Sequence, residues 1–180
     1  MLLVVAATDA ELRGAGGAAT LVCGVGPVDA AAATARALAE RRPDALLHVG
    51  VAGCRRGCGL TPPRLVLGSE ARYCDTQSPW VTATATPDQA LLAAARLALP
   101  DAALLPIGTS ADVGGTHGCD VEAMEGFAVL RAAELTGVPA LEVRAVANEI
   151  EEEDRAHWQL DAALAALAES LPALVAQLSR

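Results

Sequence analysis

Aromatic side chains and basic residues are both scarce in this sequence. Only four of its 180 residues are aromatic, namely Trp80, Trp158, Tyr73 and Phe127. A surface that stacks single-stranded RNA bases needs aromatic faces, so the composition argues against one. The 13 Lys and Arg residues stand against 22 Asp and Glu residues, which gives a formal net charge of −9. Since phosphate backbones and anionic membranes are bound by clustered basic residues, we expect neither nucleic acid nor a membrane as a partner.

Uninterrupted apolar runs and a complete set of metal ligands are also lacking. No unbroken run approaches the roughly 20 residues that cross a bilayer. The N-terminal stretch MLLVVAATDAEL has no basic region and is broken by Thr8 and Asp9, unlike a secretion signal. Five scattered cysteines indicate free buried thiols, and no second pair accompanies Cys54 and Cys58 to complete a zinc site. We therefore expect a soluble, cytoplasmic protein without a bound metal.

The sequence does contain short apolar runs that alternate with alanine-rich amphipathic stretches. This alternation predicts an α/β fold of three layers (αβα) around a central mixed, mostly parallel twisted sheet, in one domain over residues 1–180. The expected strands are Leu2–Ala7, Thr20–Cys23, Leu46–Val49, Leu65–Leu67, Leu104–Ile107 and Leu141–Val146. The expected helices are Asp29–Glu40, Asp88–Leu99, Glu122–Thr136 and Leu160–Leu178.

In such a fold, ligands bind at the carboxyl ends of the strands, so the segments that follow the strands are where a site is expected. Gly24-Val-Gly26 opens a helix, but Asp29 stands where a dinucleotide-binding loop needs its third glycine. A tight turn is therefore favoured over a bound dinucleotide. The small residues of Gly50–Gly53 are interpreted as a second turn at a strand end.

Polar side chains in these segments have structural explanations. Thr8-x-x-Glu11 fits a helix-capping box. Glu122 and Glu125 stand where a helix is expected to begin, and the helix dipole favours carboxylates there. Asn148 follows a strand and is a common turn residue. Residue types alone favour a structural role for each of these four side chains.

Four segments resemble, in the same order, the nucleoside phosphorylase and nucleosidase superfamily, and specifically its methylthioadenosine/S-adenosylhomocysteine nucleosidase branch. They are VVAATDAEL near the N-terminus, HVGVAG at 48–53, VLGSEARYCD at 66–75 and VEAMEGFAVLRAAELTGVPALEVRAVANE at 121–149. Within the branch, the MEGFAV helix, the asparagine after VRAV and the following DRAHW are most similar to the futalosine hydrolases, which release hypoxanthine from futalosine in an alternative menaquinone pathway. The resemblance implies a purine nucleoside as ligand, no cofactor, and a homo-oligomer.

The resemblance also implies roles for individual residues. Glu11 matches the acid that activates the attacking water, and Met124 and Glu125 match a pair against the ribose, where the glutamate holds the 2′- and 3′-hydroxyls. Such a carboxylate binds more strongly as positive charge develops on the sugar. Asn148 matches the position that contacts the purine near N7. An amide there can donate to the O6 of hypoxanthine, whereas the aspartate of adenine-specific relatives cannot.

Small residues and two substitutions complete the implied site. Gly53, with Ala52 beside it, matches the small wall of the base pocket. His48 and Val51 stand where bacterial phosphorylases carry an arginine and a serine for phosphate, so hydrolysis is favoured over phosphorolysis. His48 itself is expected to be a packed strand-end residue. A purine nucleoside phosphorylase, a methylthioadenosine/S-adenosylhomocysteine nucleosidase and a nucleoside-binding homologue without turnover remain as alternatives.

The chain departs from the family pattern in two places. The segment after Glu11 and the stretch GTSADVGGTHGCD at 108–120 are both shorter than in the relatives, so we expect a shortened fold. No aromatic residue falls in the second stretch to stack on the base, and Trp158 and Tyr73 are candidates for the pocket or for an interface. Trp80 is a candidate contact with a second copy. Futalosine carries a carboxylate, for which three arginines are candidates: Arg72, Arg55 and Arg56.

Overall fold

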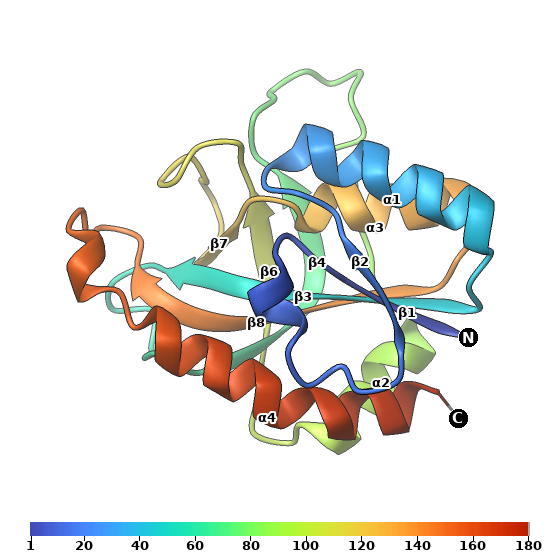
Figure 1. The fold of residues 1–180 in the computed structure, drawn as a ribbon. Helices are drawn as coiled ribbons and strands as arrows, with labels where there is room; N and C mark the ends of the chain where they lie inside the picture. Colours follow the sequence, from blue (N-terminus) through green and yellow to red (C-terminus); the bar gives the residue numbers. More distant parts are fainter. Residues whose placement is uncertain (180) are drawn as a thin grey trace.

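A computed structural model describes residues 1–179, which form an α/β fold (Figure 1). The strands are β1 (Leu2–Ala6), β2 (Ala19–Val22), β3 (Ala45–Cys54), β4 (Leu65–Tyr73), β5 (Thr84–Ala85), β6 (Ala103–Thr109), β7 (Val121–Ala123) and β8 (Ala140–Glu149). The α-helices are α1 (Pro27–Arg41), α2 (Gln89–Ala98), α3 (Gly126–Thr136) and α4 (Leu160–Leu178). Two short 3₁₀ helices, η1 (Asp9–Leu12) and η2 (Arg155–His157), lie beside the strand ends.

The strands form one mixed sheet that closes on itself. Its order is β2-β1-β3-β7-β6-β4-β5, and β8 pairs with both β3 and β4. Strands β3, β8, β4, β6 and β7 therefore form a closed ring. The α/β class and the mixed sheet are confirmed. The expectation of a three-layer αβα arrangement around a central twisted sheet is corrected, because β8 bridges β3 and β4 and turns part of the sheet into a barrel. Whether the fold is shortened stays a prediction.

Long strands and a local irregularity allow this closure. β3 and β8 are ten residues each and pair in parallel from Leu46 to Cys54, with a register shift between Ala52 and Gly53. Such a shift bends a strand and increases its twist. The far end of β3 then pairs antiparallel with β7. Gly50–Gly53 is thus the second half of a strand and not the turn expected from its small residues, because tertiary pairing overrides the low strand propensity of glycine.

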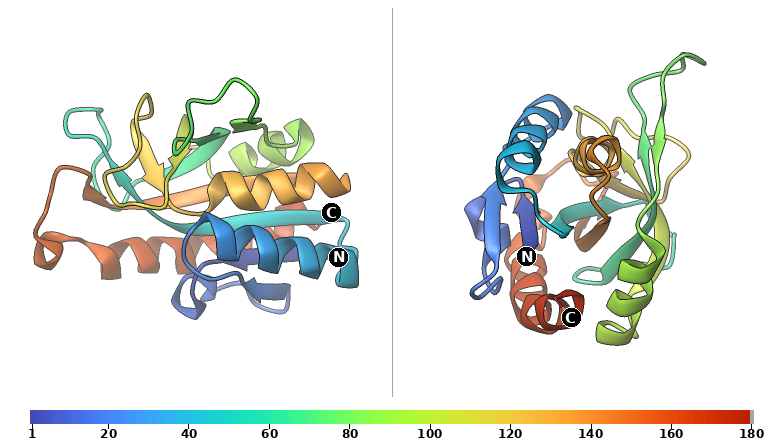
Figure 2. Two further views of the ribbon diagram at one scale, coloured as in Figure 1. Left: turned by 90° about the horizontal axis from the view of Figure 1, so that it is seen from above. Right: turned by 90° about the vertical axis from the view of Figure 1, so that its right-hand side faces the viewer.

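Helices cover the sheet from two sides (Figure 2). One buried cluster lies between the sheet and α2 with α4, a second joins the sheet to α1 and α3, and a third fills the barrel. The second cluster includes Ala30, Ala37 and Leu38 of α1 and Val129 and Ala133 of α3. These small side chains let the two helices pack closely together.

Helix α4 has an apolar face that matches its burial. The helix is 19 residues long with a mean hydropathy of 1.3, long and apolar enough to cross a membrane by these criteria alone. Asp161 and Glu169 interrupt it, so it is no unbroken apolar run. Leu167, Leu171 and Leu174 are fully buried against the sheet, and their spacing is that of a core-facing stripe on an amphipathic helix.

One of two expected features near the carboxyl ends of the strands differs from the structure. The helix expected from Glu122 begins only at Gly126, because Glu122 lies in the short strand β7. The turn at Gly24-Val-Gly26 is present as expected. Both of its glycines have positive φ, 85° and 92°, and α1 follows at Pro27. Only glycine adopts such angles without strain, so these two residues set the entry into α1.

Candidate active site

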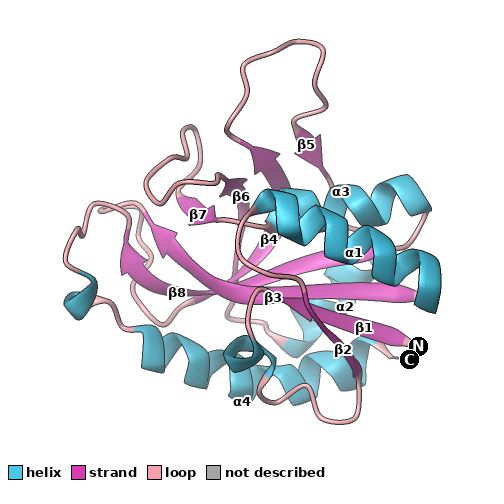
Figure 3. Ribbon diagram, turned by 45° about the horizontal axis from the view of Figure 1, so that its top comes forward, coloured by secondary structure: helices cyan, strands magenta, loops and turns pink. Residues whose placement is uncertain are grey.

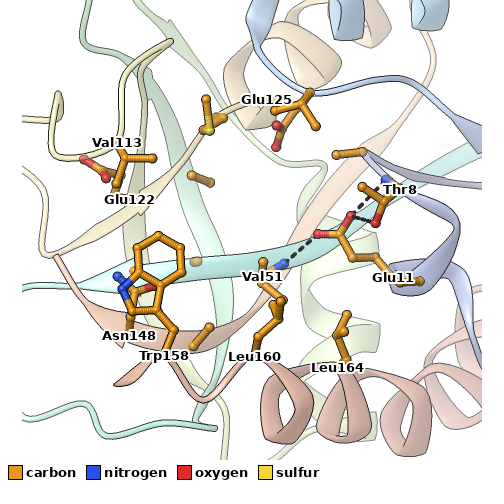
Figure 4. A pocket seen from close by; sticks show the side chains of 18 residues that line it. Thr8, Glu11, Val51, Val113, Glu122, Glu125, Asn148, Trp158, Leu160 and Leu164 are labelled. Atoms are coloured by element: carbon orange, nitrogen blue, oxygen red, sulfur yellow. Dashed lines mark hydrogen bonds between the residues drawn. The ribbon is translucent and has the colours of Figure 1, made fainter. Parts of the chain in front are cut away.

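A cavity of about 320 Å³ lies at the carboxyl ends of β1, β3 and β8. Segments from β1 and η1, β3, β7 with the start of α3, and β8 with the start of α4 contribute to its walls. All six residues assigned to the site from the sequence line it: Glu11, Ala52, Gly53, Met124, Glu125 and Asn148. In Figure 4, Glu11 and Thr8 lie at one end of the cavity, and Asn148 and Trp158 lie at the other. The remaining walls are mostly apolar, with Leu160 and Leu164 from α4 on one side.

Glu11 is held by three donors. Its Oε2 accepts hydrogen bonds from the Thr8 amide at 2.9 Å and the Thr8 hydroxyl at 2.8 Å, and its Oε1 accepts one from the Val51 amide at 3.0 Å. The first of these bonds is the glutamate half of the expected capping box. The cap therefore fixes the carboxylate, which is buried but still lines the cavity. The structural and the functional interpretations of Glu11 are compatible.

Glu125 is fixed from two directions. Its Oε1 accepts from the Gly26 amide at 3.1 Å, and its Oε2 lies 3.4 Å from Nη2 of Arg144. Glu125 precedes the first residue of α3, but its side chain makes no capping bond to that helix. Glu125 therefore lies at the start of a helix, as expected, but its carboxylate is held by Gly26 and Arg144 and not by the amides of its own helix. Its carboxylate instead points into the cavity, opposite Glu11 (Figure 4).

Arg144 lies fully buried beneath the two cavity carboxylates. It donates to Glu142 from Nε at 2.8 Å and to Nε2 of His48 from Nη2 at 2.6 Å. Because an arginine can only donate, His48 must accept at Nε2, and its Nδ1 donates to the Val5 carbonyl at 3.1 Å. His48 is thus a buried, packed strand residue, as expected. Its side chain contacts neither solvent nor the cavity.

Burial and charge act together on the pKa values of this cluster. Burial opposes the charge on Arg144, but Glu142, Glu125 and Glu11 outweigh it and raise the pKa of the guanidinium. Burial raises the pKa of Glu142 despite the opposing pull of Arg144. Burial and the nearby Arg144 charge hold the pKa of His48 well below its usual value. The histidine is therefore neutral near neutral pH.

Two glycines make room for this cluster. A Cβ at Gly50 would overlap Nη1 of Arg144 and lie 2.9 Å from Oε1 of Glu11. A Cβ at Gly126 would overlap the carboxylate of Glu142. The cluster is not among the features expected from the sequence, although one signal for it exists. Glu142 and Arg144 are two residues apart in an otherwise apolar strand, so they share a face and are placed to pair.

The other end of the cavity carries an amide and an indole. Nδ2 of Asn148 donates to the Glu149 carbonyl at 2.9 Å, which leaves its second N–H and its Oδ1 toward the cavity. A Cβ at Gly53 would lie 3.2 Å from that Nδ2, so the glycine keeps the amide accessible. Trp158, in the connection from β8 to α4, lines the cavity beside Asn148 (Figure 4).

Glu122 organises the loop that closes this end. Its carboxylate accepts from the Gly114 amide at 2.6 Å, the Thr116 amide at 3.0 Å and the Thr116 hydroxyl at 2.7 Å. The same loop brings Val113 into the cavity wall. Glu122 was placed in a first helical turn from the sequence. It lies instead in β7, from which its side chain accepts hydrogen bonds from the loop.

Several candidates from the sequence do not reach the cavity. The three arginines considered for a substrate carboxylate pair elsewhere: Arg72 with Glu70, and Arg55 and Arg56 with the acidic segment at 149–151. The stacked rings of Tyr73 and Phe127, 5.2 Å apart, also lie outside it. Trp80 is 94% exposed on the loop between β4 and β5, which projects from the body of the molecule (Figure 3).

Comparisons with known proteins identify the fold. No protein-family model matches the chain. A curated futalosine hydrolase of Streptomyces coelicolor is 52% identical over 54 residues, which is 30% of this chain and 23% of that relative's own length.

Among solved structures, a methylthioadenosine/S-adenosylhomocysteine nucleosidase of Colwellia psychrerythraea in complex with adenine superimposes with a TM-score of 0.86 at 20% identity, over 98% of this chain and 95% of the other. A futalosine hydrolase mutant of Helicobacter pylori gives 0.83 at 16% identity, over 97% and 98%. These likenesses confirm the resemblance seen in the sequence: the chain has the fold of the nucleoside phosphorylase and nucleosidase superfamily.

Proposed function

We propose that this protein is a nucleosidase that hydrolyses the N-glycosidic bond of a purine nucleoside. We further propose that the substrate is futalosine and that the products are hypoxanthine and dehypoxanthinyl futalosine. One observation carries the proposal. Two carboxylates, Glu11 and Glu125, are fixed by hydrogen bonds around one end of a mostly apolar cavity, and an amide, that of Asn148, stands at the other. This is the polarity that a nucleoside requires, with a sugar at one end and a base at the other.

The ribose end supplies electrostatic stabilisation. Cleavage of the glycosidic bond places positive charge on the sugar, and a carboxylate that is already fixed in place stabilises it at no reorganisation cost. Glu125 has one oxygen on the Gly26 amide and the other near Arg144, so it is aligned before the substrate binds. In our proposal it accepts hydrogen bonds from the 2′- and 3′-hydroxyls, with Met124 packed against the sugar.

Glu11 acts in the proposal as the base that takes a proton from the attacking water. Three of the roughly four acceptor directions of its carboxylate are already used by Thr8 and Val51, so one is left for water. Phosphate is disfavoured as the nucleophile, because no residue that lines the cavity is Lys or Arg and an anion would meet two carboxylates. His48, the one candidate cation at the expected phosphate position, is neutral and buried.

In the proposal, Asn148 recognises the base by hydrogen bonding. The N–H that Glu149 leaves unused can donate to the O6 or N7 of hypoxanthine. Gly53 and Ala52 form the small wall beside it. This arrangement, together with the 54-residue match to a futalosine hydrolase, supports hypoxanthine as the leaving group.

The central experiment is a cleavage assay. Purified protein is incubated with futalosine, inosine and methylthioadenosine, each with and without phosphate, and the released base and sugar are identified by chromatography. We expect hypoxanthine from futalosine without phosphate. A requirement for phosphate would make the protein a phosphorylase, and release of adenine alone would make it a methylthioadenosine nucleosidase. Binding without any cleavage would leave a nucleoside-binding homologue.

Two substitutions test the residue roles in the same assay. Glu125→Gln should lower kcat by about 100- to 1,000-fold, the usual effect of removing one electrostatic contact to a transition state. Glu134→Gln, on the exposed side of α3, is the matched control and should leave kcat unchanged. Asn148→Asp should shift the preference from hypoxanthine towards adenine by about 10- to 100-fold. An unchanged ratio would contradict the assigned role of Asn148.

We also propose that the protein acts as a cytoplasmic homo-oligomer that binds its small-molecule substrate without a metal or organic cofactor. Trp80 is the observation that supports self-association. Its indole is 94% exposed, and a second copy of the chain could cover this apolar area. Sedimentation of the parent and of Trp80→Ser tests this proposal. A parent that stays a monomer at micromolar concentrations would contradict it.

A further inference from the structure

Trp158 is the one aromatic side chain among the residues that line the cavity. The loop at 108–118, where an aromatic residue for the base was sought in the sequence, contributes the aliphatic Val113 instead. Trp158 enters from the other side, on the connection between β8 and α4. Figure 4 shows its ring beside Asn148, with Val113 and Glu122 across from it.

The indole is held in one orientation. Its Nε1 donates to the Glu152 carbonyl at 3.1 Å, and the next residue, Gln159, donates from its amide to the Ala147 carbonyl at 2.7 Å. The guanidinium of Arg155 lies over the ring, 5.5 Å from its centroid. Arg155 does not line the cavity and Trp158 does, so the arginine covers the ring from outside and leaves aromatic surface toward the cavity.

The loop across the cavity from the indole is also fixed by hydrogen bonds. Glu122 fixes the loop through the Gly114 and Thr116 amides, and this loop carries Val113. With an indole on one side and an aliphatic side chain from this loop on the other, the cavity has apolar walls suited to a flat heterocycle. Asn148 also lines this part of the cavity, beside the indole (Figure 4).

We infer that Trp158 is the base-stacking residue of the site and that the cavity recognises a planar heterocycle by its face through Trp158 and by its edge through Asn148. The inference rests on the proposed function, because the heterocycle is taken to be the purine of the nucleoside. Stacking on an aromatic side chain strengthens base binding by about 5- to 150-fold relative to a side chain without a ring. It acts before and during bond cleavage alike, so its loss raises KM and leaves kcat unchanged.

The experiment uses the fact that the chain has only two tryptophans. In Trp80→Phe, all tryptophan fluorescence comes from Trp158, and hypoxanthine should quench it saturably with the Kd found by calorimetry. Trp158→Leu, which keeps apolar volume but no ring, should weaken hypoxanthine binding by about 5- to 150-fold and raise KM for futalosine to match. Trp158→Phe should restore both to within a few-fold of the parent, and it guards against a folding defect in the leucine variant.

Each outcome decides the inference. Unchanged hypoxanthine binding in Trp158→Leu, binding to Trp80→Phe without any fluorescence change, or no binding of hypoxanthine at millimolar concentration would overturn it. Failure of the inference and failure of the proposed function are separable. Futalosine hydrolysis with an unchanged KM in Trp158→Leu overturns only the stacking role. Saturable quenching by hypoxanthine without any nucleoside cleavage overturns only the hydrolase.

Discussion

Replacing Arg144 by methionine tests how the buried charges beneath the site are balanced. The substitution keeps an unbranched apolar stem and removes the charged guanidinium. Glu142, which is fully buried, would then lose the only hydrogen bond of its Oε1, while its Oε2 already has no partner among residues 1–179. Removing one member of a buried ion pair costs about 3–5 kcal/mol, because the other charge is left uncompensated. For a domain of this length that corresponds to a drop in Tm of about 6 to 20 °C.

The deficit should depend on pH in a defined direction. Burial already raises the pKa of Glu142 in the folded state, and without Arg144 it rises further. A carboxyl whose pKa is higher in the folded than in the unfolded state costs stability above its unfolded pKa, and the cost fades as acid protonates it. We therefore expect Arg144→Met to lose more stability at pH 8 than at pH 5. Adding Glu142→Gln should recover part of the loss at pH 8.

Urea unfolding followed by circular dichroism at both pH values measures these free energies. Arg131→Met is the matched control, because Arg131 forms a partly exposed ion pair with Glu134 one helical turn away, and pairs of this kind contribute at most about 0.5 kcal/mol. A deficit below about 1 kcal/mol for Arg144→Met, or one that Glu142→Gln does not reduce at pH 8, would refute the reasoning.

Three further predictions concern residues around the site. His48 stays neutral in the folded state, so the free energy of unfolding of the parent should fall below pH 6.5 by up to about 1.4 kcal/mol per pH unit. In His48→Gln the loss of stability between pH 7 and pH 5, measured by urea unfolding, should be smaller. An equal loss in the parent and the variant would contradict this prediction. Gly126→Ala should cost about 1–3 kcal/mol by crowding the buried carboxylate beneath the start of α3, whereas Gly17→Ala, with nothing within 4 Å, should cost far less in the same assay. Glu122→Gln should speed hydrogen exchange of the Gly114 and Thr116 amides by about 10- to 150-fold, since their charged acceptor is lost. Unchanged protection of these two amides would contradict the assigned role of Glu122.

The position of the site could be predicted from the sequence because it depends on chain segments that end strands. Glu11 and Asn148 follow or end expected strands, and the carboxyl ends of neighbouring strands meet at one edge. Glu125 follows β7, a strand that was not expected from the sequence, so its place in the site came from the resemblance alone. The family resemblance then supplied their roles. Their local explanations are confirmed in part: the capping box of Glu11 is present, and Glu125 lies at the start of α3 but makes no capping bond to that helix.

The pairing of Glu142 with Arg144 has a signal in the sequence, but the position of these charges beneath the site could not be predicted, because it depends on how two distant strands align. Parallel pairing of β3 with β8 places His48 opposite Glu142 and Gly50 opposite Arg144. Only this register gives the arginine both a partner and the space beside a glycine. A one-residue slip would turn every one of these side chains to the other face. The closure of the barrel depends in the same way on the pairing of β8 with both β3 and β4.

The closed ring also determines which edges of the sheet are open to other chains. Each strand of the ring has a neighbour on both sides, so among the described strands only β2, with four residues, and β5, with two, lie at the ends of the sheet order. Edges this short are poor templates for adding a strand from another molecule. Two copies would therefore associate through side-chain surfaces, such as the projecting loop that carries Trp80, and not by continuing the sheet from one molecule into the next.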